Sequence, residues 1–331
     1  MVGHMAVTIK DIAKVANVSY STVSKALNDS PLVKPITKEK IIKIAEELGY
    51  QPNFAAQRLV QKKSKTIGVI WPTLERIAPA AIISKINEHA KHNEYNILLS
   101  IDEIEISLQQ FQRFQVDGVI AFDEQAMTDF TGNHLNIPII AYGVNSPQKN
   151  FSIVDVDYEG AISQAVQFFS ERKYKRLAFI GDTDSRDDRQ LAKLNSFIHA
   201  TEKFEIDHSV FNSKGLDWIN GYNCIQEILE EDTNLPDGVI CSSYDITSGV
   251  IRGLQEKNIH IPRDISIIGY DNIPQMSNLE VPVTSVGVSN DSIAQSLVNT
   301  LIMQIDKGTN EKMVYSLRSS LVVRESTRND I

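Results

Sequence analysis

Three polar side chains near the start of the chain, Tyr20, Ser21 and Lys25, open a short helical pattern of apolar residues. At this spacing we expect them to face outward on one side of a helix. Hydroxyl and ammonium groups presented in this way can bond to base edges in the major groove of DNA. The sequence therefore predicts that these three residues read a DNA sequence.

The residues around this helix have the types and spacing that a helix-turn-helix requires. Ala13 is small enough to let two helices approach, and Asn17 tolerates the left-handed turn conformation for which Gly is the commoner choice. Val18 and Val23 are placed to pin the second helix against the first. We therefore interpret residues 5–50 as a DNA-binding headpiece.

Apolar residues recur at helical spacing in three short blocks, at residues 9–16, 22–27 and 41–48. Ser19 can cap the second helix and Thr37 the third, because a hydroxyl accepts from an unpaired amide of the first turn. Gly49 suits a left-handed helix end. A fourth short helix is expected over residues 54–61, within a hinge and linker at 51–65.

Charge is distributed unevenly along the 331 residues, whose formal net charge is −9. Residues 5–65 carry 11 Lys and Arg against 5 Asp and Glu, whereas the rest of the chain carries 22 against 37. A basic segment on an acidic body attracts a polyanion to one part of the protein and repels it elsewhere. The asymmetry therefore supports a nucleic-acid partner.

Beyond residue 66 the pattern changes to short Val- and Ile-rich runs that alternate with amphipathic helical stretches. Strands are expected at residues 67–70, 96–99, 118–121, 138–141, 176–180, 238–241 and 265–269, and helices at 82–92, 162–172, 246–257 and 293–305. The continuous apolarity of the strands indicates parallel sheets buried on both faces. These elements predict an α/β core of two doubly wound parallel-sheet subdomains, with a ligand cleft beyond the carboxyl ends of the strands.

Several classes of function lack their usual signals. No apolar run is long enough to span a membrane and no secretory signal is present, so we expect a cytoplasmic protein without membrane contact. Cys224 and Cys241 form no zinc or disulfide pattern, and the acidic loop 182–188 lacks the glycine of a calcium loop. No Walker A or GxSxG sequence occurs. We therefore expect no metal, no cofactor and no catalytic residues.

Residues 8–28 read TIKDIAKVANVSYSTVSKALN and resemble the headpiece signature of the lactose and galactose repressor family. The stretch GYQPNFAAQRL at 49–59 resembles the hinge helix of that family. The resemblance implies that Leu59 wedges into the minor groove and kinks the operator, with Ala56 beside it in the groove. Further DNA contacts, mostly to phosphates, are implied for Thr8, Ser19, Thr22, Asn28, Thr37 and Asn53.

The resemblance extends over essentially the whole chain. Core segments that carry it include KTIGVI (65–70), VDGVI (116–120), VDYEGA (156–161), RLAFIG (176–181), IPRDISIIGYD (261–271) and LVVREST (321–327). They are similar to a periplasmic-binding-protein-like core, here residues 66–331, in which an effector lies between two subdomains. The implied N-subdomain spans about 66–158 plus 289–318, and the C-subdomain about 159–288 plus 319–331.

The same resemblance implies an effector site that includes Ile82, an apolar wall position, and Asp271, an acid that accepts bonds from sugar hydroxyls. Trp71 can stack on a sugar face, although a tryptophan at a strand end is at least as often part of the core. The family clamps its effector with an Arg four residues before an aromatic. Lys193 fits that spacing here, and Arg189 is the alternative.

Departures from the family pattern concern the chemistry of both sites. Lys25 stands where many members carry Arg, and lysine lacks the planar two-donor fork that Arg offers to guanine. Ser243 and Tyr244 stand where the family has an Asn-Asp pair, with Asp245 one place later, and Gly143 replaces an acidic residue. We therefore expect an effector site of altered chemistry.

The resemblance implies a homodimeric repressor whose affinity for operator DNA is controlled by a small-molecule effector, a sugar or sugar phosphate. One alternative is the same regulator controlled by a protein coregulator, which the altered pocket positions would favour. Another is a sugar-binding transport component or an enzyme. The headpiece and the missing export signal argue against this last class.

Overall fold

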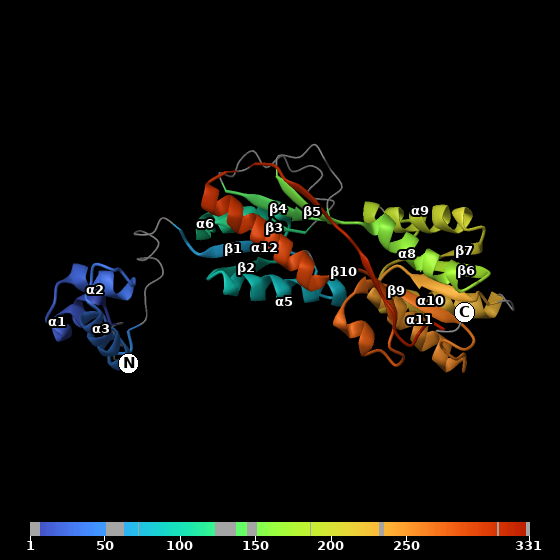
Figure 1. Cartoon of the computed structure of the whole chain (residues 1–331), viewed down its shortest axis with the longest axis horizontal. Coiled ribbons are helices and arrows are strands. Elements are labelled where there is room, and N and C mark those ends of the chain that lie inside the picture. Colours follow the sequence, from blue (N-terminus) through green and yellow to red (C-terminus); the bar gives the residue numbers. More distant parts are fainter. Residues whose placement is uncertain are drawn as a thin grey trace. The chain divides into compact units, whose positions relative to one another are not determined.

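A computed structural model describes residues 7–50, 63–71, 73–122, 137–143, 151–185, 187–231, 235–309 and 311–328 of the chain (Figure 1). The chain divides into two compact units, Met1–Ser64 and Lys65–Ile331. Where it is described, the first unit is helical, and the second combines helices with two sheets. The predicted order of a helical headpiece followed by an α/β core is confirmed.

The first unit packs three helices around one apolar core: α1 Ile9–Ala16, α2 Tyr20–Leu27 and α3 Pro35–Glu47. Asn17 follows α1 with a φ of 56°, the left-handed conformation that the helix-turn-helix pattern predicts. Ser19 caps α2 as expected, because its hydroxyl accepts from the amide of Thr22 at 3.1 Å. Val23 is fully buried in the shared core, so α2 is held against α1.

The start of α3 differs from the prediction that Thr37 caps it. The helix begins at Pro35, Lys34 occupies the cap position, and Thr37 lies inside the helix. Proline favours the first turn because its fixed φ suits a helix and its missing amide would be unpaired there. Gly49 has a φ of 67°, as expected for a left-handed helix end. The fourth helix expected at 54–61 lies outside the described residues.

The first sheet of the second unit has the strand order β11-β5-β4-β3-β1-β2, with parallel pairing throughout. Its strands are β1 Thr66–Ile70, β2 Asn96–Ser100, β3 Gly118–Ala121, β4 Ile139–Tyr142, β5 Ser152–Val156 and β11 Val314–Leu317. Helices α5 (Ile77–His92) and α12 (Asn290–Lys307) cover one face, and α6 (Ile104–Phe114) covers the other. Its apolar strand runs are therefore buried on both faces, as predicted.

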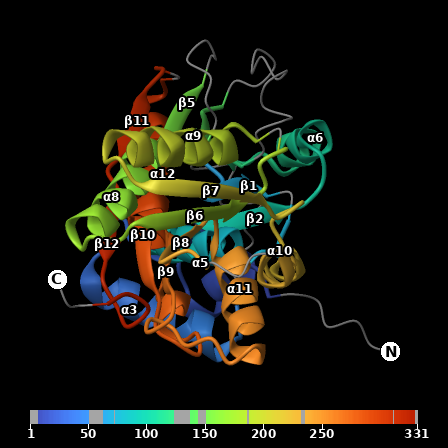
Figure 2. The ribbon, with the colours of Figure 1, turned by 90° about the vertical axis from the view of Figure 1, so that its right-hand side faces the viewer.

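The second sheet has the strand order β12-β10-β9-β8-β6-β7. Its strands are β6 Arg176–Gly181, β7 Asp207–Asn212, β8 Gly238–Cys241, β9 Ser266–Asn272, β10 Thr284–Ser289 and β12 Ser320–Val322. Helices α8 (Tyr158–Glu171) and α9 (Asp188–Lys203) cover one face, whereas α10 (Trp218–Glu231) and α11 (Tyr244–Glu256) cover the other (Figure 2). A short 3-10 helix, Pro274–Ser277, follows β9. The edge strand β12 runs antiparallel to β10, so the predicted parallel pattern ends there.

We call the first sheet with α5, α6 and α12 the first lobe, and the second sheet with α8 to α11 the second lobe. The chain passes between the lobes three times, after β5, after β10 and after β11. Helix α12 follows β10 of the second lobe directly but packs on the first lobe against α5. Each lobe is therefore assembled from segments that are distant in the sequence, and three short crossings join the lobes.

Candidate functional site

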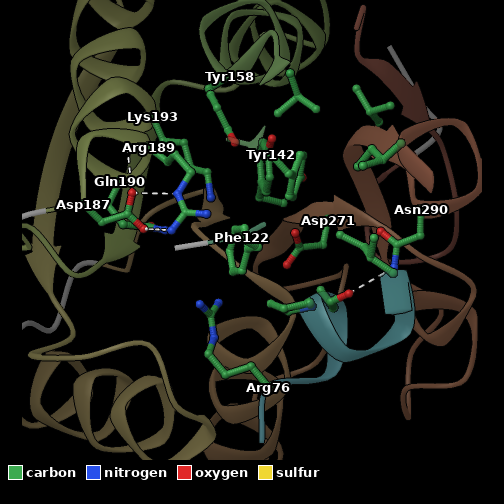
Figure 3. Close-up of a pocket in the computed structure, with 17 residues that line it drawn as sticks. Arg76, Phe122, Tyr142, Tyr158, Asp187, Arg189, Gln190, Lys193, Asp271 and Asn290 are labelled. Atoms are coloured by element: carbon green, nitrogen blue, oxygen red, sulfur yellow. Dashed lines mark hydrogen bonds and ion pairs between the residues drawn. The ribbon is translucent and has the colours of Figure 1, made fainter. Parts of the chain in front are cut away.

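A pocket lies between the two lobes, at the carboxyl ends of their strands (Figure 3). The described residues that line it are Arg76, Ala78, Pro79, Ile82, Phe122, Tyr142, Val156, Tyr158, Asp187, Arg189, Gln190, Lys193, Tyr270, Asp271, Val288, Asn290 and Ile293. The carboxyl edge of an open parallel sheet is where such folds bind ligands. The structure thus places a cleft where the strand pattern predicts one.

The structure brings together only part of the effector site expected from the sequence. Four expected residues line the pocket: Ile82, Arg189, Lys193 and Asp271. Three are not among its lining residues: Trp71, Tyr244 and Asp245. Each of these three nevertheless contacts a lining residue.

Aromatic rings form one wall of the pocket. Phe122 stacks on Trp71 with ring centroids 4.5 Å apart, and the Tyr142 ring lies 5.4 Å from that of Phe122. Trp71 is fully buried in the core of the first lobe, so Phe122 faces the pocket in its place. Burial raises the pKa of the Tyr142 phenol, which therefore stays neutral and can donate a hydrogen bond to a ligand.

Asp187 and Arg189 form a closed ion pair at the start of α9. The Asp187 carboxylate caps the helix by accepting from the amide of Arg189 at 2.8 Å. Its two oxygens also accept from Nε and Nη2 of Arg189, at 2.8 and 2.7 Å. A two-point pair of this kind is the strong form of an Arg–carboxylate contact. Asp187 therefore holds the Arg189 guanidinium in place, 4.6 Å from the centroid of the Phe122 ring.

Lys193 lies one helical turn beyond Arg189 and is only 4% exposed. Its Nζ donates to the carbonyl oxygen of Ser242 at 2.9 Å and lies 3.8 Å from the centroid of the Tyr270 ring. Burial lowers the pKa of this ammonium to about 8, although the nearby Asp271 acts in the opposite direction. The position that the family uses as a clamp thus carries a buried cation.

Asp271 belongs to β9 and has a φ of 86°, which is uncommon for a residue with a side chain. Its Oδ2 accepts from the backbone amide of Tyr244 at 2.9 Å. That bond orients the carboxylate, which points into the pocket (Figure 3). Tyr244 therefore supports the site through its backbone while Asp271 faces a ligand.

Sequence reasoning does not identify Arg76, which the structure places in the pocket wall. This residue immediately precedes α5, and its guanidinium points into the pocket (Figure 3). Its Nε lies 3.6 Å from Oδ2 of Asp245, which is beyond hydrogen-bond distance. Burial raises the pKa of the Asp245 carboxyl, and Arg76 partly opposes this effect. The loop before α5 has no periodicity or motif from which this role could have been predicted.

In the first unit, the exposed side of α2 carries the residues expected to read DNA. Tyr20 is 54% exposed, and Ser21 and Lys25 are also exposed, as their spacing predicts. Lys25 forms part of the last turn of the helix. These three side chains are therefore available to a DNA groove.

Four of the remaining residues expected at DNA, Thr8, Ser19, Thr22 and Asn28, make local bonds. Thr8 forms a capping box with Asp11, and the Ser19 hydroxyl lies 2.8 Å from that of Thr22. Asn28 donates through Nδ2 to the carbonyl oxygen of Ser24 at 2.8 Å. These bonds hold the side chains at the ends of the helices. For the hydroxyl groups, this is a helix-capping role. Asn53, Ala56 and Leu59 lie outside the described residues.

The part of the chain that the structure describes offers no metal site and no membrane-spanning helix. No group of three or more His, Cys, Asp or Glu there could hold a metal ion. No helix in those ranges is long and apolar enough to cross a membrane. Cys224 and Cys241 are free and buried, and burial raises the pKa of both thiols. The raised pKa favours the neutral, less reactive thiol at both positions.

Comparison with known proteins identifies relatives of both units. Residues 8–53 match the profile described as "Bacterial regulatory proteins, lacI family", and residues 166–327 match "Periplasmic binding protein-like domain". Catabolite control protein A of Priestia megaterium is 30% identical over 335 residues, which cover 98% of this chain and 100% of the relative. The probable HTH-type transcriptional repressor ExuR of Bacillus subtilis is 30% identical over 342 residues, with 97% and 98% covered.

A solved structure shows the same fold. The crystal structure of the lac repressor dimer bound to operator and the anti-inducer ONPF superposes with a TM-score of 0.82. The match is 24% identical and covers 98% of this chain and 99% of that chain. The fold and the full-length similarity to curated regulators lead to one conclusion: the chain belongs to the lacI family of bacterial regulatory proteins and is a DNA-binding transcriptional regulator.

Proposed function

We propose that this regulator is a homodimeric repressor controlled by a small hydroxylated molecule, a sugar or sugar phosphate, bound in the pocket between its lobes. The observation that carries the proposal is the pocket lining. A ligand there touches α5 and α12 of the first lobe as well as α9 and β9 of the second. Such a ligand can favour one arrangement of the lobes over another, and differential affinity of this kind is what allosteric control requires.

The three crossings between the lobes give this control a structural basis. Each lobe has its own apolar core, and short segments after β5, β10 and β11 join them. Asn290, at the start of α12, donates to the carbonyl oxygen of Ala78 in α5 at 3.1 Å. Both residues line the pocket, so a ligand lies directly against one of these crossings.

On the DNA side, a homodimer would present two copies of α2 to the half-sites of a pseudo-palindromic operator. Tyr20, Ser21 and Lys25 would then contact base edges. The local bonds of Thr8 and Ser19 leave these side chains at helix N-termini, where phosphates commonly bind, whereas Asn28 follows the C-terminal end of α2. In the solved lac repressor structure a dimer is bound to operator, and we extend that arrangement to this chain.

The pocket is suited to binding rather than to turnover. Among its described lining residues there is no Ser, Cys or His to act as a nucleophile with a base. The Asp187 carboxylate is committed to Arg189. We therefore propose a non-enzymatic regulator that acts in the cytoplasm, where its operator lies.

Selection from a pool of randomised operators tests the DNA half of the proposal. The wild-type chain should enrich a pseudo-palindromic site, and Lys25→Ala should relax preference at the base pair that Lys25 contacts. Lys203→Ala, which removes a charge from α9 of the core, is the matched control and should enrich the wild-type site. Absence of any enriched site would refute the proposal. Selective binding that no small molecule alters would instead favour a protein coregulator.

A further inference from the structure

We propose that the effector is a polyol that carries an anionic group, with Arg76 and Lys193 holding the anion and Asp271 and Gln190 accepting from the hydroxyls. This inference rests on the proposed function of the pocket as an effector site. It separates acidic sugars and sugar phosphates, which the pocket should take, from neutral sugars, which it should bind less well.

Among the three cationic side chains of the pocket, Arg189 is not available to a ligand anion. Both of its paired nitrogens are directed at the Asp187 carboxylate, which is itself held at the start of α9. This pair is neutral as a whole. The charge available to a ligand therefore comes from the remaining lining residues, Arg76, Lys193 and Asp271.

Arg76 has the position and geometry of an anion receptor. Its nearest carboxylate, Asp245, lies 3.6 Å from Nε, and Nε itself is buried without a hydrogen-bond partner. The guanidinium points into the space that Lys193 and Asp271 also face (Figure 3). A guanidinium offers parallel donors that match two oxygens of a carboxylate or phosphate. An anionic ligand would supply the acceptors that Asp245 does not reach.

Lys193 is the second cation and is buried more deeply. Of its three N–H donors, one is directed at the Ser242 carbonyl, and the Tyr270 ring lies against the ammonium. Within the described ranges, no carboxylate oxygen is in ion-pair contact with Nζ. A buried cation without a carboxylate partner carries a desolvation cost that a ligand anion would offset.

Two acceptors in the pocket are placed to bind ligand hydroxyls. Gln190 is 5% exposed and lines the pocket, and its buried Oε1 has no hydrogen-bond partner. Asp271 uses Oδ2 to accept from the Tyr244 amide, which leaves Oδ1 to accept from a ligand. Inorganic phosphate alone would not donate to both groups. A neutral sugar would leave Lys193 without an anion and Arg76 with only the Asp245 carboxylate, 3.6 Å away. A hydroxylated anion would satisfy the two cations and the two hydrogen-bond acceptors together.

Calorimetric titration of the full chain with matched compounds tests this inference. The panel is glucose, glucuronate and glucose 6-phosphate, the corresponding galactose series, and inorganic phosphate. At least one uronate or hexose phosphate should bind at least about tenfold more tightly than its neutral parent, the gain expected from one charge-assisted contact. Comparing uronates with phosphates distinguishes the two kinds of anion.

Variants then assign the preference to the pocket. Arg76→Gln should remove most of the gap between the anion and its neutral parent, whereas Arg76→Lys should restore part of it. Arg113→Gln, on the exposed side of α6, makes the same charge change outside the pocket and should leave the gap intact. Because the wild-type preference is measured without any substitution, a poorly folded variant does not prevent the test.

Each outcome separates this inference from the proposed function. Equal or tighter binding of the neutral parents would overturn the anion preference and retain a sugar-controlled regulator. Binding by none of the compounds would overturn the inference as well, and operator selection would then decide the DNA-binding role separately. An anion preference that survives Arg76→Gln unchanged would remove Arg76 from the site.

Discussion

The ammonium of Lys193 lies 3.8 Å from the centroid of the Tyr270 ring, so that a cation from α9 rests on an aromatic side chain from β9 in the wall of the pocket. Burial lowers the pKa of Lys193 to about 8. The charge of the pocket therefore changes within a pH range that binding experiments can reach.

We predict that binding of an anionic effector weakens as pH rises above about 8. Below that pH, Lys193 is already protonated in the free protein, so affinity should be flat. Above it, binding requires proton uptake, because the ligand anion raises the pKa of Lys193 in the complex. Affinity should then fall by up to about tenfold per pH unit. Calorimetry with a uronate between pH 6.5 and 9.5 measures this, and Lys193→Gln should flatten the profile. A wild-type profile that is flat throughout would show that Lys193 does not hold the anion.

Asp271→Asn should weaken effector binding by about tenfold or more while changing stability little. The amide oxygen can still accept from Tyr244, and Asn tolerates the positive φ of this position. The charged acceptor for ligand hydroxyls is lost. Calorimetry and thermal unfolding measure the two effects. Unchanged affinity would mean that the carboxylate has only the structural role of fixing the start of α11.

Ser19→Ala should destabilise the first unit by about 1 kcal/mol, because the Thr22 amide loses its cap. Hydrogen exchange of the amides in α2 reports this locally. Ser21→Ala is the comparison, since the Ser21 hydroxyl lies 2.9 Å from that of Ser19 but accepts from no backbone amide of α2, and is expected to contact DNA. It should lower operator affinity with little change in exchange. If both variants behaved alike, capping and DNA contact would not be separable in this way.

Gly249→Ala should destabilise the second lobe by about 2 kcal/mol or more. A Cβ there would lie 2.6 Å from the backbone nitrogen of Tyr222 and closer still to the carbonyl oxygen of Trp218, so α10 and α11 would have to separate. Gly253→Ala is the matched control on α11. Its added Cβ would clash with Cγ2 of the buried Ile225 and lie 3.1 Å from Nε2 of Gln226. These are side-chain rather than backbone atoms, so a smaller shift relieves the clash. Chemical denaturation should show the larger loss for Gly249→Ala, and the reverse order would contradict this account of the helix contact.

Leu59→Ala should weaken operator binding and leave nonspecific DNA binding nearly unchanged. The expectation follows from the resemblance of 49–59 to the family hinge helix, whose leucines wedge into the minor groove. Fluorescence titrations against an operator and a nonspecific duplex compare the two affinities. Equal loss of affinity for both DNAs would show that Leu59 does not act by wedging into the minor groove of the operator.

The headpiece could be predicted in detail because its determinants are local. A left-handed Asn17, the Ser19 cap and the outward Lys25 each depend on a few neighbouring residues. The one error, at Thr37, arose where two local rules competed and Pro35 set the helix start. Among the inner strands, β5 and β10 were not expected, whereas the others were equally predictable from their apolar runs. The edge strand β7 was not, because its sequence DHSVFN is largely exposed and carries no such run.

The pocket could be predicted only in part because its residues meet across two lobes. Lys193 and Asp271 were found through the family pattern of residues around them, whereas Arg76 belongs to a loop without any pattern. Trp71 is a residue type that can stack on a sugar. Only the packing of the folded protein shows that Phe122 covers it. Contacts between residues so distant in the sequence can be identified only from the folded structure.

The most direct test of the account measures operator affinity with the pocket empty and with it saturated by the compound that binds best in calorimetry. Coupling between the sites predicts a change of about fivefold or more in operator affinity, and an equal reciprocal change in effector affinity when operator is present. Arg76→Gln should abolish the change at the same effector concentration. Operator affinity that is identical with the pocket empty and saturated would contradict the claim that this pocket controls DNA binding.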